Sequence, residues 1–218
     1  MERWFSRRVL TKMPQLLSGI GLLGFGVALM DAGALGFGPW SVLAEGFADR
    51  AGIALGTADI LIGIPILLAW VLVRERPGIG TLFNVFGVGL AINAGIVLLP
   101  EPEAMGWRIA ATTGGMLTAG IGIALYLAAD LGPGPRDGLM TGLHRRLGWS
   151  IRLVRTTLEL GALTAGFFLG GTVGYGTILM AFGIGPVIQA ALRVFDREGR
   201  VMRRAAPVVA PAVLPVDR

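Results

Sequence analysis

One short stretch occurs twice in this chain, and each copy interrupts a long apolar segment. The first copy, residues 35–43, is LGFGPWSVL, and the second, residues 131–139, is LGPGPRDGL. Glycine and proline are poorly tolerated inside a helix, so each copy must end one helix and begin another. Pro39 and Pro135 suit the first position of the new helix, where a missing N–H leaves no hydrogen bond unmade. The chain is therefore predicted to contain two copies of one helical unit built around this break.

The two units align without a gap over most of their length. Gly36 corresponds to Gly132, an offset of 96 residues (132 − 36 = 96). Self-similarity at a fixed offset is the signature of a repeated architecture. Chance matches of glycine are expected in a chain with 35 glycines, but matches of other residue types are not. The same offset also aligns Pro39 with Pro135, Arg50 with Arg146, Gly80 with Gly176 and Thr81 with Thr177.

The composition places these units in a membrane. The chain is 54% hydrophobic and only 15% charged, with a mean hydropathy of +0.71, whereas soluble domains carry about 25% charged residues. The many glycines fit the close backbone contacts of membrane helices. The net charge of +5 does not indicate a nucleic-acid partner, because the basic residues lie at segment ends and not along one face. We expect an all-α membrane protein.

Six segments are long enough to cross a bilayer, which requires about 20 residues. Two further helices, at 39–50 and 135–147, are too short to span and either lie in the interface or re-enter the membrane. The predicted organisation is a basic and aromatic anchor (1–15), two three-helix repeats (16–99 and 108–195) and a disordered tail (199–218). The predicted spans are 16–34, 53–73, 79–99, 108–129, 151–169 and 175–194.

Two independent arguments predict an inverted repeat. Each unit has three spans, an odd number, so the second unit begins on the opposite side of the membrane from the first. Basic residues mark alternate segment ends, and the opposite ends keep only Arg50 and Arg108. By the positive-inside bias, both termini are expected in the cytoplasm.

The two breaks are the first candidates for function. A restarted helix presents unpaired N–H groups and the positive end of its dipole, and non-helical backbone at membrane depth is tolerated where it lines a cavity. The alternative for the breaks is a tight turn that allows helices to pack closely. The alternative for Gly80-Thr81 and Gly176-Thr177 is helix capping. The substrate-path candidates are Gly36, Gly38, Pro39, Trp40, Gly132, Gly134, Pro135, Asp137, Gly80, Thr81, Gly176 and Thr177.

Polar residues inside spans are costly and therefore point to function. Glu159, in the fifth predicted span, is the candidate for coupling to an ion gradient, and its alternative is a local pair with Arg155. Asp59 lies nearer the end of its span, and Asn93 and Gln189 are expected to hydrogen-bond between helices.

Enzyme signatures are missing from the sequence. It contains no HExxH, no GxSxG and no glycine-rich loop followed by a Walker lysine. It also has no cysteine, and its single histidine, His144, lies in a basic segment. We expect neither catalysis nor a metal or other cofactor.

The residues of the two breaks, with Gly80-Thr81 and Gly176-Thr177, resemble the YczE/YyaS/YitT group of bacterial multi-pass membrane proteins, and above all its YczE branch. The resemblance covers nearly the whole chain apart from its ends. It implies a location in the bacterial inner membrane, and some members have been linked to the export or production of secreted small molecules.

Two functions follow as hypotheses. The first is a secondary permease or exporter of an unidentified small molecule, driven by an ion gradient. The second is an accessory protein that helps another membrane complex to assemble. The expected partners are the lipid bilayer, a small molecule, and either a second copy of the chain or another membrane protein.

Overall fold

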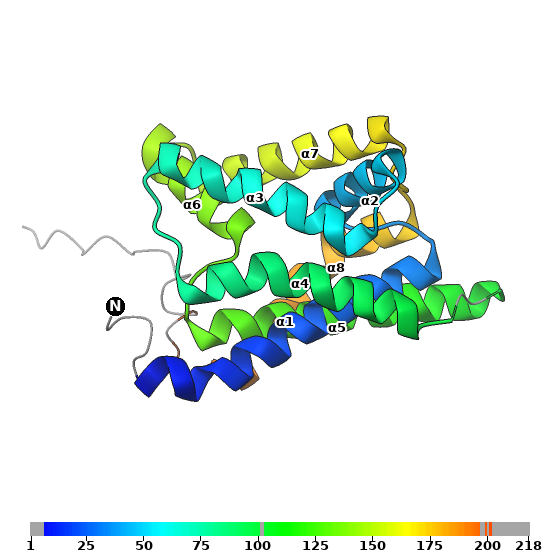
Figure 1. The fold of residues 1–218 in the computed structure, drawn as a ribbon, viewed down its shortest axis with the longest axis horizontal. Coiled ribbons are helices and arrows are strands. Elements are labelled where there is room, and N and C mark those ends of the chain that lie inside the picture. Colours follow the sequence, from blue (N-terminus) through cyan, green and yellow to red (C-terminus); the bar gives the residue numbers. More distant parts are fainter. Residues whose placement is uncertain (1–6, 101–102, 197–198, 200, 202–218) are drawn as a thin grey trace, which may run out of the picture.

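A computed structural model of the chain describes residues 7–100, 103–196, 199 and 201. Over these residues the fold consists of eight helices without strands, which confirms the all-α class (Figure 1). Residues 1–6 of the predicted anchor and nearly all of the predicted tail lie outside the described residues. The helices are α1 (Arg7–Gly33), α2 (Pro39–Ala51), α3 (Leu55–Val73), α4 (Ile79–Leu98), α5 (Met105–Ala129), α6 (Pro135–Leu147), α7 (Ile151–Leu169) and α8 (Tyr175–Phe195).

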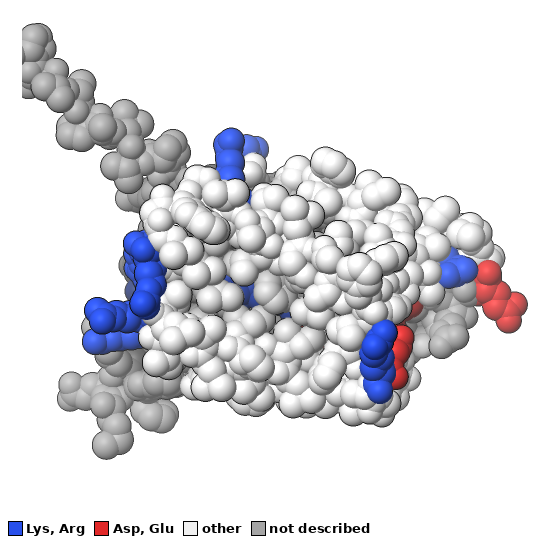
Figure 2. Space-filling model, turned by 90° about the horizontal axis from the view of Figure 1, so that it is seen from above, with Lys and Arg blue, Asp and Glu red and all other residues white. Residues whose placement is uncertain are grey.

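Five of these helices, α1, α3, α4, α5 and α8, are long and apolar enough to cross a membrane. The remaining long helix, α7, has 19 residues but carries Arg152, Arg155 and Glu159 in its first half, so its predicted role as a span stays a prediction. Figure 2 shows most Lys and Arg gathered at one end of the long axis and both signs of charge at the other, with mostly uncharged side chains between. This distribution fits a protein embedded in a bilayer.

Each break forms the predicted short helix. α2 begins at Pro39 and α6 begins at Pro135, and each follows an extended glycine. The turn before each helix requires a glycine, because Gly36 (φ 94°) and Gly132 (φ 133°) adopt backbone angles that other residues rarely reach. The two short helices lie toward opposite ends of the molecule (Figure 1).

Helices pack both within their own unit and against the other unit. α1 and α5 pack together most extensively, with α4 against α1 and α8 against α5. Each short helix packs against the third helix of the other unit, α2 against α7 and α6 against α3. Glycines allow the contact between α1 and α5, since a Cβ atom on Gly122 would lie only 2.4 Å from the backbone nitrogen of Leu23.

Each break is joined to the other unit by a backbone hydrogen bond, and the two bonds are equivalent. The N–H of Gly80, at the start of α4, donates to the carbonyl of Leu131 at 2.9 Å. The N–H of Gly176, at the start of α8, donates to the carbonyl of Leu35 at 2.8 Å. Donors and acceptors are both related by the 96-residue offset of the sequence. The turn before each short helix is therefore held by a helix N-terminus of the opposite unit.

Candidate functional site

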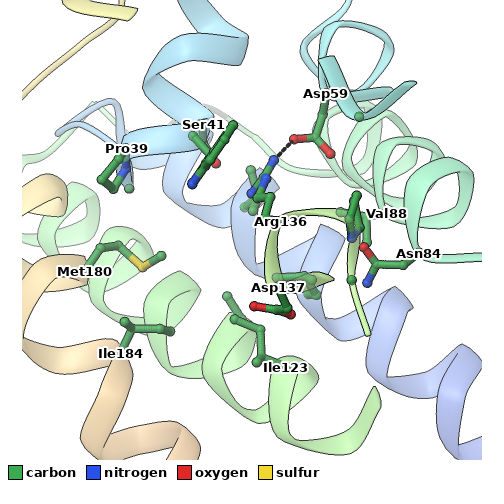
Figure 3. A pocket seen from close by; sticks show the side chains of 18 of the residues that line it. Pro39, Ser41, Asp59, Asn84, Val88, Ile123, Arg136, Asp137, Met180 and Ile184 are labelled. Atoms are coloured by element: carbon green, nitrogen blue, oxygen red, sulfur yellow. Dashed lines mark hydrogen bonds and ion pairs between the residues drawn. The ribbon is translucent and has the colours of Figure 1, made fainter. Parts of the chain in front are cut away.

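A cavity of about 370 Å³ lies between the two breaks, and all eight helices contribute to its lining. Residues 38–41, which begin α2, and residues 134–137, which begin α6, both reach it. The two copies of one sequence motif thus converge on a single cavity from opposite ends of the fold (Figures 1 and 3).

Arg136 links three helices at the centre of the cavity. Its guanidinium donates to the Asp59 carboxylate on α3 at 2.5 Å, as the dashed line in Figure 3 marks. Its Cζ atom also lies 5.1 Å from the centroid of the Trp40 ring on α2. A guanidinium over an indole face makes a favourable cation–π contact. The side chain of Asp59 is only 13% exposed, so Arg136 supplies the charge that this partly buried carboxylate requires.

Asp137, the next residue, points away from Asp59 toward Ile123 on α5 (Figure 3). Its Oδ2 atom accepts a hydrogen bond of 2.8 Å from the Tyr126 hydroxyl. No Lys or Arg among the described residues makes an ion pair with it. Asp137 is therefore a carboxylate of the cavity that is held by a neutral donor.

Asn84 completes this side of the cavity. It lies on α4, one turn after the helix begins, and is 9% exposed. Its Nδ2 atom has no hydrogen-bond partner in the structure. Because an unpaired buried amide costs free energy, such a group in a cavity wall indicates a missing partner. We call Asn84, Tyr126 and Asp137 the polar corner.

The opposite side of the cavity is apolar. Met180 and Ile184 of α8 lie across the cavity from Asn84 in Figure 3. By the 96-residue offset, Met180 corresponds to Asn84 and Ser41 corresponds to Asp137. The two units therefore place different chemistry at equivalent positions. We call Met180, Ile184 and Ile188, all from α8, the apolar wall.

Glu159 also lines the cavity, from α7. Its Oε1 atom accepts a hydrogen bond of 2.9 Å from Arg155, which likewise lines the cavity. Glu159 therefore makes the local pair with Arg155 and also lies in the cavity wall. Asp59, for which the sequence indicated only a position near a helix end, is bound to Arg136 instead of to water alone.

The other predicted site residues divide into two groups. Gly38, Pro39, Trp40, Gly134, Pro135 and Asp137 line the cavity. The remaining six hold the turns together. Thr81 and Thr177 are buried, and each accepts a hydrogen bond of 3.1 Å from the N–H three residues earlier. The six residues outside the lining are Gly36, Gly80, Thr81, Gly132, Gly176 and Thr177.

Three residues of the site were missed from the sequence. Asn84, Tyr126 and Arg136 lie in predicted helices, but the sequence does not indicate which face of each helix meets the cavity. A signal was available for Asn84, because a polar residue one turn after a Gly–Thr helix start is costly in a membrane. The described residues contain no group of three His, Asp or Glu side chains arranged as metal ligands.

Comparison with known proteins finds relatives that match most of the chain. A family model described as a family of unknown function, DUF6198, matches residues 10–193. An uncharacterised protein of Haemophilus influenzae is 40% identical over 182 residues, covering 84% of each chain. The uncharacterised membrane protein YczE of Bacillus subtilis is 34% identical over 177 residues, covering 80% of this chain and 82% of its own.

The uncharacterised protein YyaS of Bacillus subtilis is 23% identical over 183 residues, covering 82% of this chain and 91% of its own. No solved structure matches the chain. The predicted resemblance to the YczE group is confirmed, and the apolar helices agree with a membrane location. The chain belongs to the DUF6198 family and is a relative of the YczE membrane proteins.

Proposed function

We propose that this protein is a secondary permease that carries a small molecule across the bacterial inner membrane. The observation that carries the proposal is the convergence of the two breaks, residues 38–41 and 134–137, on one cavity. In many transporters, discontinuous helices related by an inverted repeat form the substrate site near the middle of the bilayer. A partly charged cavity inside a membrane protein also marks a path for a polar solute.

The proposal includes α7 as a sixth span and an inverted relation between the two units. Support comes from the equivalent hydrogen bonds of Gly80 and Gly176 and from the exchanged packing of α2 and α6. The three charged residues of α7 are compatible with a span, because Arg155 and Glu159 face the cavity and not only lipid. With six spans, both termini lie on the same side of the membrane, and by the positive-inside bias this side is the cytoplasm.

Transport requires the cavity to open to each side of the membrane in turn. The contacts between Arg136, Asp59 and Trp40 join α6 to α2 and α3 across the cavity. Side-chain contacts of this kind can break and re-form as one unit moves against the other. We propose that they hold the described conformation until the substrate binds. An ion gradient drives the movement, with Glu159 as the coupling acid.

The test begins with the purified full chain in detergent. Its thermal stability is measured against a panel of amines, amino acids, carboxylates, sugars and nucleosides. A ligand at 100 times its dissociation constant stabilises the folded state by about 2.7 kcal/mol, which is readily detected. Ligands that stabilise are then tested for counterflow in proteoliposomes that contain the protein.

The matched variants are Ser41→Phe, which fills the cavity beside the first break, and Thr157→Phe, on the exposed surface of α7. We expect counterflow in the wild type and in Thr157→Phe, and its loss in Ser41→Phe with the protein still folded. A folded protein that binds none of the panel and copurifies with another membrane protein supports the accessory role instead. Counterflow that persists in Ser41→Phe contradicts a path through this cavity.

A further inference from the structure

We infer that the cavity selects an apolar amine, in its protonated form, that carries an oxygen atom close to the nitrogen. The polar corner binds the ammonium and the oxygen, and the apolar wall covers the rest of the molecule. This inference rests on the proposed function, because it names the class of solute that the same cavity takes.

The first argument is the balance of charge. The lining contains three carboxylates and two guanidinium groups. Arg136 pairs with Asp59, and Arg155 pairs with Glu159. These two pairs leave one carboxylate, Asp137. A ligand with one positive charge would balance it, whereas an anion would add a second uncompensated negative charge at low dielectric.

The second argument is the position of the oxygens around Gly134. A Cβ atom at this residue would lie 3.2 Å from Asp137 Oδ2, 3.2 Å from the Tyr126 hydroxyl and 3.5 Å from Asn84 Oδ1. A side chain at Gly134 would therefore crowd these groups, and the three oxygens lie close to one another beside this glycine. An ammonium has three donors and no acceptor, so it suits such a group of oxygens.

The third argument is the unpaired amide of Asn84. Its Nδ2 atom is a buried donor without a partner in the wall of the cavity. An ammonium cannot accept this hydrogen bond, but a hydroxyl or carbonyl oxygen beside the nitrogen can. A ligand with both groups would satisfy the carboxylate and the amide together.

The fourth argument concerns the remainder of the ligand. Met180 and Ile184 lie across the cavity from the polar corner and offer no hydrogen bonds (Figure 3). Methionine and isoleucine side chains favour contact with an apolar body, and methionine adapts to its shape. A small, fully polar amine would leave this wall in contact with water. The ligand is therefore amphipathic.

The test compares four probes of similar size on the purified full chain: phenylalaninol, 2-phenylethylamine, 3-phenylpropanol and phenylacetate. Affinity is taken from the concentration dependence of the thermal shift. We expect phenylalaninol to bind best, 2-phenylethylamine to bind more weakly, and the neutral and anionic probes to bind at least tenfold more weakly than phenylalaninol.

Two variants test separately which residue binds the ammonium and which binds the oxygen. Asp137→Asn is expected to lower the affinity for both amines at least tenfold, and Asn84→Leu to remove the preference for phenylalaninol over 2-phenylethylamine. Asp49→Asn, an exposed acid of α2 outside the cavity, is the matched control and is expected to bind as the wild type does. If Asp137→Asn does not fold, the ranking of the four probes and the Asn84→Leu variant still test the inferred class of ligand.

Equal or tighter binding of 3-phenylpropanol or phenylacetate overturns the inference, as does unchanged amine binding in folded Asp137→Asn. A folded wild type that binds neither amine overturns it as well. These failures are separate from failure of the permease proposal, which stands if another solute shows counterflow that Ser41→Phe abolishes.

Discussion

Arg136 lies over the indole ring of Trp40, with its guanidinium carbon 5.1 Å from the ring centroid, and these two residues occupy equivalent positions in the two sequence repeats. Under a two-fold relation between the units, a residue can touch its own equivalent only close to the axis. The contact therefore puts the starts of α2 and α6 beside the proposed axis. It also explains how one cavity can serve both breaks.

The ion pair between Arg136 and Asp59 should contribute measurably to the stability of the folded protein. Replacing Arg136 with Gln leaves Asp59 partly buried without its cation, and we expect a loss of about 2 kcal/mol, between the values for exposed and buried pairs. Unfolding of the purified protein measures it. The double variant with Asp59→Asn should lose less than the two single changes together, because no unpaired charge remains.

Arg155 provides the comparison for Arg136. It also pairs with a carboxylate of the cavity, but its side chain is 54% exposed and its partner Glu159 is 39% exposed. An exposed pair four residues apart on a helix contributes about 0.5 kcal/mol or less. A loss in Arg155→Gln as large as that in Arg136→Gln would show that burial does not separate the two pairs.

The glycine at the start of α8 should not tolerate a side chain. A Cβ atom on Gly176 would lie 1.9 Å from the carbonyl oxygen of Gly36, a backbone atom that cannot turn aside. We expect Gly176→Ala to lose about 1–3 kcal/mol or more through overpacking. On the same helix, a Cβ on Gly185 would meet nothing within 4 Å.

Gly185→Ala is therefore the control, and it should gain up to about 1 kcal/mol from better helix propensity. Thermal stability and the fraction of monodisperse protein after purification measure both variants. Similar behaviour of the two variants would contradict the close approach of the first turn of α8 to the break before α2.

The two arginines on the predicted outer side cap helix ends. Arg108 donates to the carbonyls of Gly33 at 2.9 Å and Ala34 at 2.8 Å, where α1 ends. Arg50 donates in the same way to the last carbonyls of α7, those of Phe168 and Leu169. Carbonyls at a helix end lack partners within the helix, and a cation there also favours the dipole.

We therefore expect Arg108→Ala to lose about 1.5–3 kcal/mol, the range for hydrogen bonds to charged groups. Arg152→Ala, which removes an exposed arginine of α7, should change stability by less than about 0.5 kcal/mol. Thermal unfolding of the two purified variants decides, and equal stability of both would show that the capping bonds carry no net free energy.

The orientation in the membrane can be tested because the chain has no cysteine. Single cysteines at Glu103 and Arg76, both exposed, lie in the loops before α5 and after α3. Glu75 is less suitable, because it is half-buried and bound to Arg145. A membrane-impermeant maleimide should label residue 103 in intact cells and residue 76 only after permeabilisation. Labelling of both in intact cells would contradict an odd number of spans between them.

The helices could be predicted from the sequence because glycine and proline act locally. The predicted short helices, 39–50 and 135–147, agree with α2 and α6 to within one residue. The first span was placed at 16–34, but α1 begins at Arg7. Hydropathy marks where a helix meets lipid and not where its hydrogen bonds begin, so the basic residues of the first turns were left out.

The chemistry of the cavity could be predicted only in part, because it depends on how the helices are turned toward each other. Of the two asparagines in α4, Asn93 was predicted to hydrogen-bond between helices, and it bonds to Gly56 and Thr57 of α3. Asn84 has no such partner and lies in the cavity wall. The two positions look alike in the sequence, and only packing against α3 and α6 separates them.

The contact between α3 and α6 differs from the equivalent contact between α7 and α2, and no sequence pattern predicted this difference. Trp70 of α3 fits under Gly138 of α6, and its Nε1 atom donates to the carbonyl of Pro135 at 2.9 Å. At the equivalent contact, the large and small residues are exchanged, with Val42 of α2 against Gly166 of α7. Each pair is complementary only once the two units are assembled, so neither could be read from one segment alone.

The coupling role of Glu159 gives the last prediction. Glu159 lies in the cavity wall and its side chain is 39% exposed, so its carboxylate can reach a transported ion even while it accepts a hydrogen bond from Arg155. In proteoliposomes, Glu159→Gln should abolish accumulation of substrate against its gradient. Counterflow of substrate should continue, because exchange needs a binding site and a moving cavity but no coupling ion. Arg155→Gln keeps the carboxylate and should retain at least part of the accumulation. If Glu159→Gln accumulates substrate as the wild type does, Glu159 serves only its local ion pair, and the acid that couples transport must be sought at Asp137 or Asp59.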